Sequence, residues 1–344
     1  MISLTSAIIS ASLIASPLGV RAITLEYSTY LGGSSVDSGL GIAVNNAQAF
    51  VVGHTYSPDF PTADPYQASL PSIAKWDVFL SAFSSSGSSL IFSTYLGGSE
   101  RDLGYAIGLD NGEVIIAGYT DSSDFPTRVP YQSSLAGPPD VFVSRLSSSG
   151  SQLIFSTFLG GGGADEGYGL AVDNGQAYVT GWTQSTNFPL FAAYQTSYAG
   201  GVYDSFVSKF SSDGSQLAFS TYLGGEGIDN ANGIAVENGS AFVTGWTQSS
   251  DFPVLDPFQA SSASPAFYDV FVSKLSTSGS RLLYSTYLGG TDYDYGYGIA
   301  VDNGQAYVAG WTQSTNFPLF AAYQTSYASG EYDSFVSKFS SDGS

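Results

Sequence analysis

Five flat rings recur at one position of a repeating pattern and are the residues best suited to ligand binding. Each follows a glycine at the end of an apolar run; the five are His54, Tyr119, Trp182, Trp246 and Trp311. Three glutamines follow the tryptophans by two positions: Gln184, Gln248 and Gln313. Aromatic walls with a few polar groups are typical of small-ligand sites. The pattern predicts a stacking platform for sugar rings. The alternative is that the rings pack against the Phe-Pro of the loop that follows.

Five aspartates also recur, each six residues after a leucine that marks the repeat: Asp37, Asp102, Asp165, Asp229 and Asp294. Hard cations bind clustered carboxylate and carbonyl oxygens, so a ring of these side chains is a candidate Ca²⁺ site. The alternative is that each carboxylate accepts hydrogen bonds from the backbone of its own Gly-rich connection. Recurrence in every repeat favours the alternative, and no other cofactor is expected.

A second recurring aspartate opens the third apolar run of each repeat and follows an aromatic residue in four of the five: Asp77, Asp140, Asp204, Asp269 and Asp333. Its position at the start of a run predicts structural hydrogen bonds.

Catalytic chemistry has little support. His54 is the one histidine and the chain has no cysteine, so neither a thiol nucleophile nor a multi-histidine metal centre can form. Hydrolysis of a glycosidic bond needs a pair of carboxyl groups, but the glutamates fall at non-equivalent positions of the repeats. We therefore expect no enzyme, with a carboxylate glycosidase as the less favoured alternative.

The net charge limits which classes of partner the protein can bind. The 344 residues include 29 Asp and Glu against 9 Lys and Arg, a formal charge of −20. Nucleic-acid binding needs a basic surface, so a nucleic-acid partner is excluded. Hydrophobic residues make up 43% of the chain, so the acidity does not indicate disorder.

Internal repeats dominate the organisation of the chain. The motif S-T-(Y/F)-L-G-G occurs five times, with its leucine at Leu31, Leu96, Leu159, Leu223 and Leu288. Each unit of about 64 residues holds four short runs rich in Val, Ile, Phe, Tyr and Thr, separated by turn-forming residues. Four antiparallel strands per unit predict an all-β fold, a five-bladed β-propeller of residues 23–344. The Leu-Gly-Gly connections and the long Phe-Pro loops should share one face, where a ligand site is expected.

The two ends of the chain suggest how the propeller closes. Residues 24–31 match the fourth run of the other units, and that run is missing after the last Ser-Asp-Gly turn. We expect this N-terminal strand to complete the last blade and close the ring, which would remove an exposed sheet edge. The alternative is a stretch of a longer array.

Residues 1–22 form an apolar leader with small residues before Ala22, although it carries no Lys or Arg near its start. The leader predicts a signal peptide and a secreted or cell-surface bacterial protein. No segment approaches eighteen apolar residues, so no membrane span is expected.

The repeated motifs resemble the bacterial SBBP-type β-propeller repeat. The resemblance rests on Y-S-T-Y-L-G-G, on D-x-G followed by I-A-V-D, on A-Y-V-T-G, and on D-F-P and D-x-F-V-S-K-L, and it covers all five units. It implies a secreted or surface protein without a settled catalytic activity. Its name implies seven blades, whereas the units counted here predict five. We expect a binding module for a glycan or cell-surface polymer, or alternatively an architectural domain that packs on other copies of itself; the oligomeric state is left open.

Overall fold

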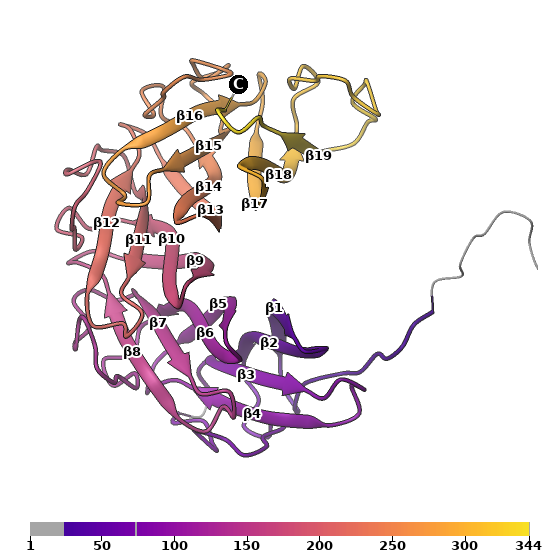
Figure 1. The fold of residues 1–344 in the computed structure, drawn as a ribbon, viewed down its shortest axis with the longest axis vertical. Helices are drawn as coiled ribbons and strands as arrows, with labels where there is room; N and C mark the ends of the chain where they lie inside the picture. Colours follow the sequence, from indigo (N-terminus) through magenta and orange to yellow (C-terminus); the bar gives the residue numbers. More distant parts are fainter. Residues whose placement is uncertain (1–23, 73, 344) are drawn as a thin grey trace, which may run out of the picture.

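The fold of the chain is entirely β in the computed structural model, which describes residues 24–72 and 74–343. Nineteen strands form five antiparallel sheets, four with four strands and the last with three (Figure 1). The predicted all-β architecture of repeated four-stranded blades is confirmed.

Each sheet is a meander in which consecutive strands pair. The first two sheets hold β1 (Asp37–Asn45), β2 (Gln48–Thr55), β3 (Asp77–Phe83) and β4 (Leu90–Leu96), then β5 (Asp102–Asp110), β6 (Glu113–Thr120), β7 (Asp140–Leu146) and β8 (Leu153–Leu159). The next two hold β9 (Asp165–Asp173), β10 (Gln176–Thr183), β11 (Asp204–Phe210) and β12 (Leu217–Leu223), then β13 (Asp229–Glu237), β14 (Ser240–Thr247), β15 (Asp269–Leu275) and β16 (Leu282–Leu288). The last sheet holds β17 (Asp294–Asp302), β18 (Gln305–Thr312) and β19 (Asp333–Lys338).

Tight turns set the register of the first hairpin of each sheet. In the third sheet the turn residues Asn174 and Gly175 have φ values of 51° and 73°. Two consecutive residues with positive φ define the type I′ turn, whose twist matches that of antiparallel strands and which Asn-Gly adopts at low cost. The predicted Asn-Gly turns are therefore confirmed.

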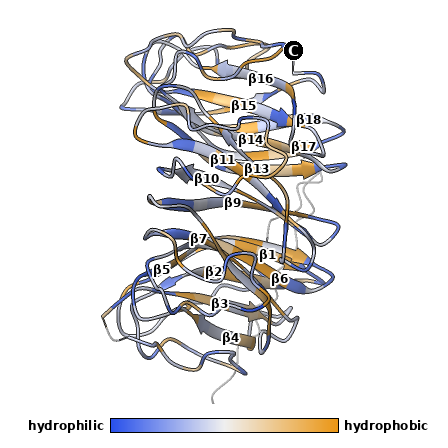
Figure 2. Ribbon diagram, turned by 90° about the vertical axis from the view of Figure 1, so that its left-hand side faces the viewer, coloured by the Kyte–Doolittle hydropathy of each residue, from blue (hydrophilic) through white to orange (hydrophobic). Residues whose placement is uncertain are grey.

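The hydrophobic core lies between neighbouring sheets. In the third sheet, Val207 packs with Ala231 and Ile234 of the fourth, and clusters of the same kind join the other neighbouring pairs. Much of the hydrophobic colouring in Figure 2 accordingly lies along the strands. Each of the three inner sheets buries both faces against neighbours, whereas the first and last sheets each have one face without a neighbouring sheet.

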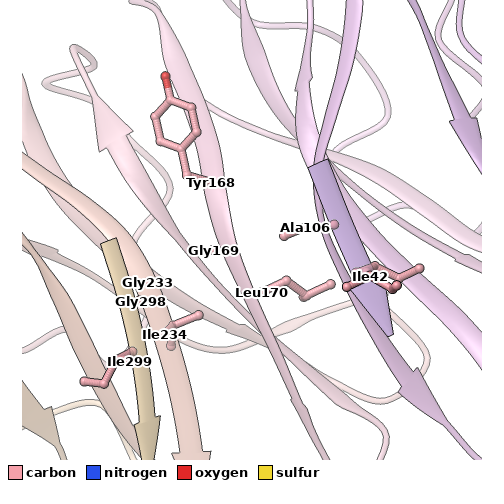
Figure 3. Close-up of a pocket in the computed structure, with 11 residues that line it drawn as sticks. Ile42, Ala106, Tyr168, Gly169, Leu170, Gly233, Ile234, Gly298 and Ile299 are labelled. Atoms are coloured by element: carbon pink, nitrogen blue, oxygen red, sulfur yellow. The ribbon is translucent and has the colours of Figure 1, made fainter. Parts of the chain in front are cut away.

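The first strand of every sheet faces a central channel, as the propeller prediction expects. A cavity of about 250 Å³ there is lined by residues of β1, β5, β9, β13 and β17, among them Ile42, Leu170, Ile234 and Ile299. Figure 3 shows these aliphatic side chains, and the ring of Tyr168 on β9 points away from them. The side chains that line this cavity are therefore mostly aliphatic.

The predicted closure of the ring is not observed. Residues 24–36 form no strand, β19 has no fourth strand beside it, and Figure 1 shows a gap between the first and last sheets. The N-terminal residues do lie where an outer strand would, but against the first sheet. The ring of Tyr27 covers Gly87, with its nearest atom 2.2 Å from where a Cβ on that glycine would stand.

The same contact recurs at each boundary between sheets. Aromatic residues of the outer strands cover the turn glycine of the next sheet in the pairs Phe92–Gly150, Phe155–Gly214, Phe219–Gly279 and Tyr284–Gly343. Leu31 also packs against the cluster of Phe60, Phe79 and Tyr95. These contacts place Tyr27 and Leu31 against the first sheet, on the far side of the gap from β19 (Figure 1).

Candidate ligand-binding face

A close approach between two strands positions each of the five recurring rings. Gly181 precedes Trp182, and a Cβ on Gly181 would stand 1.8 Å from the carbonyl oxygen of Glu166. A β-bulge in the paired inner strand, at the register shift next to Gly181, brings that carbonyl close. Only glycine fits there, so the bulge and the glycine together fix where Trp182 leaves the sheet.

The five rings belong to a larger band of aromatic side chains, which we call the aromatic belt. On the first three sheets it contains His54, Trp76, Tyr105, Tyr119, Tyr168 and Trp182. The ring centroids of His54 and Trp76 are 4.9 Å apart, and those of Tyr105 and Tyr168 are 5.0 Å apart. Trp182 Nε1 donates a hydrogen bond of 3.3 Å to the Tyr168 hydroxyl.

The belt continues without a break over the last three sheets. Its members there are Tyr203, Trp246, Tyr268, Tyr295, Trp311 and Tyr332. Trp246 lies 4.4 Å from Tyr268, and Trp311 lies 4.2 Å from Tyr295, centroid to centroid. Rings from all five sheets therefore form one connected aromatic surface, which includes all five predicted ring positions.

The predicted packing of the rings against Phe-Pro is not observed. The phenylalanine of each Phe-Pro is buried against the third strand of its own sheet instead, in the pairs Phe60–Phe79, Phe125–Phe142, Phe188–Phe206, Phe252–Phe271 and Phe317–Phe335. Each of the five predicted rings has another belt ring as a partner. Tyr119 and Trp246 are 5% and 8% exposed, whereas Trp182, Trp311 and Tyr203 are half-buried.

Charged groups break the symmetry of the belt near the second and third sheets. The Arg101 guanidinium lies 5.2 Å from the ring centroid of Tyr119 and pairs with Asp121 at 2.8 Å. The Tyr168 hydroxyl donates to the Glu166 carboxylate, and burial raises the pKa of Glu166. These groups offer hydrogen-bonding partners beside flat rings.

The remaining predicted ligand residues lie next to the belt. Burial lowers the pKa of His54, and its Nδ1 is buried without a hydrogen-bond partner, so His54 acts as a neutral ring. Gln248 and Gln313 are half-buried, and Gln184 is exposed. Their backbone N–H groups fix the Gly-rich connections by donating to Ala164, Ile228 and Tyr293 carbonyls.

The first set of aspartates joins each connection to the sheet that follows. Asp165 accepts hydrogen bonds from Gly161 N at 2.7 Å, from Ser185 Oγ at 2.9 Å and from the Thr183 hydroxyl. The corresponding residues make the same bonds at Asp37, Asp102 and Asp229. Among residues 24–72 and 74–343, no cluster of three metal-ligating side chains is present. The geometry thus favours the capping role over a ring of cation ligands, and the Ca²⁺ site stays a prediction.

The second set of aspartates opens the third strands and also caps backbone. Asp204 accepts a hydrogen bond of 2.7 Å from Ala199 N, and Asp140 accepts one of 2.8 Å from Ala136 N. Aspartates of the first and second sets lie close together at the first glycine of the Leu-Gly-Gly connection. A Cβ on Gly160 would stand 2.5 Å from Asp140 Oδ1 and 2.7 Å from Asp165 Oδ2.

These paired carboxyl groups hold protons more tightly than aspartate does in water. Burial raises the pKa of Asp165 to about 7 and that of Asp204 to about 7, with the neighbouring carboxylates adding to both shifts. Burial likewise raises the pKa of Asp77 and Asp102, which face each other. The buried aspartates therefore carry less charge near neutral pH than the formal count implies.

Sequence reasoning predicted five of the twelve belt rings and missed seven. The rings before the third strands, Trp76, Tyr203, Tyr268 and Tyr332, follow the signal noted for the second aspartates, which an aromatic residue precedes in four of five units. The inner-strand rings Tyr105, Tyr168 and Tyr295 had no such signal. The bulge in each first strand decides which side chains reach the belt, and local sequence does not show its position.

Comparison with known families identifies the repeat. A family model described as a β-propeller repeat, SBBP, matches residues 154–189, 218–253 and 283–318. Each match runs from an outer strand across the connection into the next sheet. The fold and these matches define the chain as a β-propeller-type repeat protein. At these three places the resemblance to the SBBP repeat is confirmed.

Individual relatives are distant. The regulatory protein FlaEY of Caulobacter vibrioides is 28% identical over 242 residues, which are 64% of this chain and 24% of that longer protein. Among solved structures, Kuenenia stuttgartiensis hydrazine synthase aligns over 90% of this chain and 66% of its own, with 10% identity and a TM-score of 0.46. The β-xylosidase CoXyl43 from a compost metagenome aligns over 92% and 94%, with 11% identity and a TM-score of 0.37. A nidogen/laminin complex aligns over 79% and 72%, with 11% identity and a TM-score of 0.39.

The described residues contain no helix long and apolar enough to cross a membrane.

Proposed function

We propose that the protein is a binding module that recognises a neutral glycan through the aromatic belt. The observation that supports this function is the connected band of rings from all five sheets, with half-buried members such as Trp182 and Trp311. Flat rings bind the apolar faces of sugars, and adjacent polar groups such as Gln184 and Glu166 serve their hydroxyls. The net charge of −20 disfavours acidic polysaccharides.

Binding without hydrolysis fits the carboxyl groups of the site. Recurring aspartates such as Asp165 and Asp204 are buried and accept hydrogen bonds from the protein's own backbone, and Glu166 accepts from Tyr168. We propose further that the protein acts outside the cell, as its leader predicts. Incubation with a bound glycan should leave the glycan intact; release of reducing ends would favour the glycosidase alternative.

A glycan array of neutral oligosaccharides and polysaccharides tests the proposal. Wild-type protein should bind at least one neutral glycan, and Trp182→Ala and Trp311→Ala should each weaken that binding about fivefold, since stacking on one ring contributes on the order of 1 kcal/mol. Phe191→Ala is the matched control, because Phe191 is an exposed aromatic outside the belt. Equal weakening by Phe191→Ala, or no effect of the tryptophan variants, would contradict the assignment.

A further inference from the structure

Three charged residues break the pattern of the repeats where the second sheet joins the third. The counterparts of Arg101 in the other units are uncharged: Val36, Ala164, Ile228 and Tyr293. The counterparts of Glu166 are also uncharged: Ser38, Leu103, Asn230 and Tyr295. Asp121 stands where the other units have an aromatic ring or an amide: Tyr56, Gln184, Gln248 and Gln313. The three lie close enough to act on one another's charge, and we call them the charged cluster.

Arg101 presents free hydrogen-bond donors above an aromatic ring. Its Nε donates to Asp121 Oδ2 at 2.8 Å, and its guanidinium carbon lies 5.2 Å from the ring centroid of Tyr119. Within residues 24–72 and 74–343, neither terminal nitrogen of Arg101 has a hydrogen-bond partner, and 42% of the side chain is exposed. Asp121 and Tyr119 therefore hold the guanidinium in place while its terminal N–H groups stay open to a ligand.

Glu166 offers an acceptor that the protein itself orients. The Tyr168 hydroxyl donates to one oxygen of the Glu166 carboxylate, and Trp182 Nε1 donates to the Tyr168 oxygen at 3.3 Å. The hydroxyl of Tyr168 has a single proton, which is used on Glu166. The other carboxylate oxygen accepts no hydrogen bond from the part of the chain that the structure describes, and Glu166 is half-buried. This oxygen is therefore a fixed acceptor that a ligand can reach.

The charges of the cluster indicate the chemistry of its ligand. One guanidinium lies beside two carboxyl groups, so an anionic ligand would meet a net negative charge, and a cationic ligand would meet Arg101. A sugar hydroxyl both donates and accepts, so two adjacent hydroxyls can accept from Arg101 and donate to Glu166 together. The rings of Tyr119 and Trp182 stand ready for the apolar face of the same sugar.

We propose that the charged cluster is the anchoring subsite of the glycan, where Arg101 and Glu166 bind two adjacent hydroxyl groups of one neutral sugar residue. This inference rests on the proposed function and adds a specificity-determining site to it. A sugar that lacks a hydroxyl in the right position leaves a charged group without its partner, so the subsite selects among sugars that would stack equally well on flat rings.

Two substitutions remove the two hydroxyl partners separately. Arg101→Met has no donors, and Glu166→Gln still accepts from Tyr168 but presents no carboxylate. In calorimetry each should weaken binding of the best-bound neutral glycan of the array about tenfold, since hydrogen bonds to charged groups are the stronger ones. Arg128→Met and Glu331→Gln change exposed charges outside the belt and should bind like the wild type. Circular dichroism checks that all four variants are folded.

Sugar epimers give a readout that a purely structural role of the charged cluster would not change. Oligosaccharides that end in glucose, galactose or mannose differ in the configuration of single hydroxyl groups. The wild type should prefer one of them, and Arg101→Met and Glu166→Gln should each bind the three more equally. A wild type that binds glycans but does not distinguish these epimers would overturn the inference.

Other outcomes separate this inference from the proposed function. Binding that Trp182→Ala weakens but that Arg101→Met and Glu166→Gln leave unchanged would overturn the anchoring subsite and leave the aromatic belt as the binding surface. Binding of uronic-acid glycans that depends on Arg101 would also overturn it, because the cluster would then recognise a carboxylate. A wild type that binds no glycan at all would overturn the proposed function and this inference with it.

Discussion

At the residue scale, the recurring aspartates show how one side chain can hold the same connection between sheets in each repeat through hydrogen bonds. In the first set, the carboxylates of Asp37, Asp102, Asp165 and Asp229 each join a linker amide, a threonine and a serine. Each of these carboxylates replaces water for three donors that would otherwise be unsatisfied. The second set places another carboxyl group beside the same linker glycine. Hydrogen bonding and mutual repulsion therefore oppose each other at every boundary between sheets.

This arrangement makes stability depend on pH. The pKa values of Asp165 and Asp204 are about 7 in the folded chain, above the value of an unfolded aspartate, so the folded state binds more protons. Their contribution to stability is complete below about pH 4 and is lost as pH rises through about 7. We expect the melting temperature to be more than about 5 °C higher at pH 5 than at pH 8, measured by circular dichroism.

Asp204→Asn should reduce this pH dependence, because the amide can still accept from Ala199 N but carries no charge. Glu331→Gln, which removes one exposed charge, should leave it unchanged. A melting temperature that rises from pH 5 to pH 8 would show that these carboxyl groups are ionised in the folded chain.

At the scale of the strand, the glycine before each belt ring is required by the bulge of the neighbouring strand. A Cβ on Gly245 would stand 1.8 Å from the Asn230 carbonyl oxygen. We expect Gly245→Ala to lower the free energy of unfolding by about 3 kcal/mol, because backbone must shift to admit the methyl group. Urea denaturation measures this change.

Gly298→Ala provides the matched control for that substitution. Gly298 lies in β17, the first strand of the last sheet. A Cβ on Gly298 would meet no atom within 4 Å. Its replacement should change the free energy of unfolding by less than about 0.5 kcal/mol. Equal losses from the two variants would mean that the bulge does not explain the glycine before the ring.

The strands and turns were predictable because their signals are local. Runs such as Ala177-Tyr178-Val179 and turns such as Asn174-Gly175 determine their own conformation within a few residues. The composition of the belt was only partly predictable. Tyr105 and Tyr168 reach it through bulges, and their contact joins neighbouring sheets, which the sequence of one repeat does not reveal.

At the scale of the whole molecule, the five sheets form an open arc (Figure 1). This arrangement agrees with the predicted position of residues 24–31 but separates them from the last sheet. The match of residues 24–31 to the other outer strands was correct in position, since Tyr27 covers Gly87 as Phe92 covers Gly150. The predicted pairing with the last sheet is not observed, because β19 lies across the gap from that position (Figure 1). Whether residues 24–31 pair with β19 depends on how the sheets are arranged around the ring. The number of repeats in the sequence does not determine that arrangement.

The aromatic belt spans the whole arc, so its function is a property of the molecule and not of one blade. The chain has four tryptophans, Trp76, Trp182, Trp246 and Trp311, and all four lie in the belt. Intrinsic tryptophan fluorescence therefore reports on this surface alone. A bound sugar would remove water from the half-buried rings and change their emission.

The most direct measurement is a tryptophan fluorescence titration with a neutral glycan that binds on the array. The tryptophan emission of the wild-type protein should change saturably, at the same glycan concentrations that saturate binding. The change should be smaller in Trp182→Ala and Trp311→Ala, and Phe191→Ala should behave like the wild type. Saturable glycan binding by calorimetry with no change in tryptophan emission would contradict it, because the glycan would then bind away from the belt.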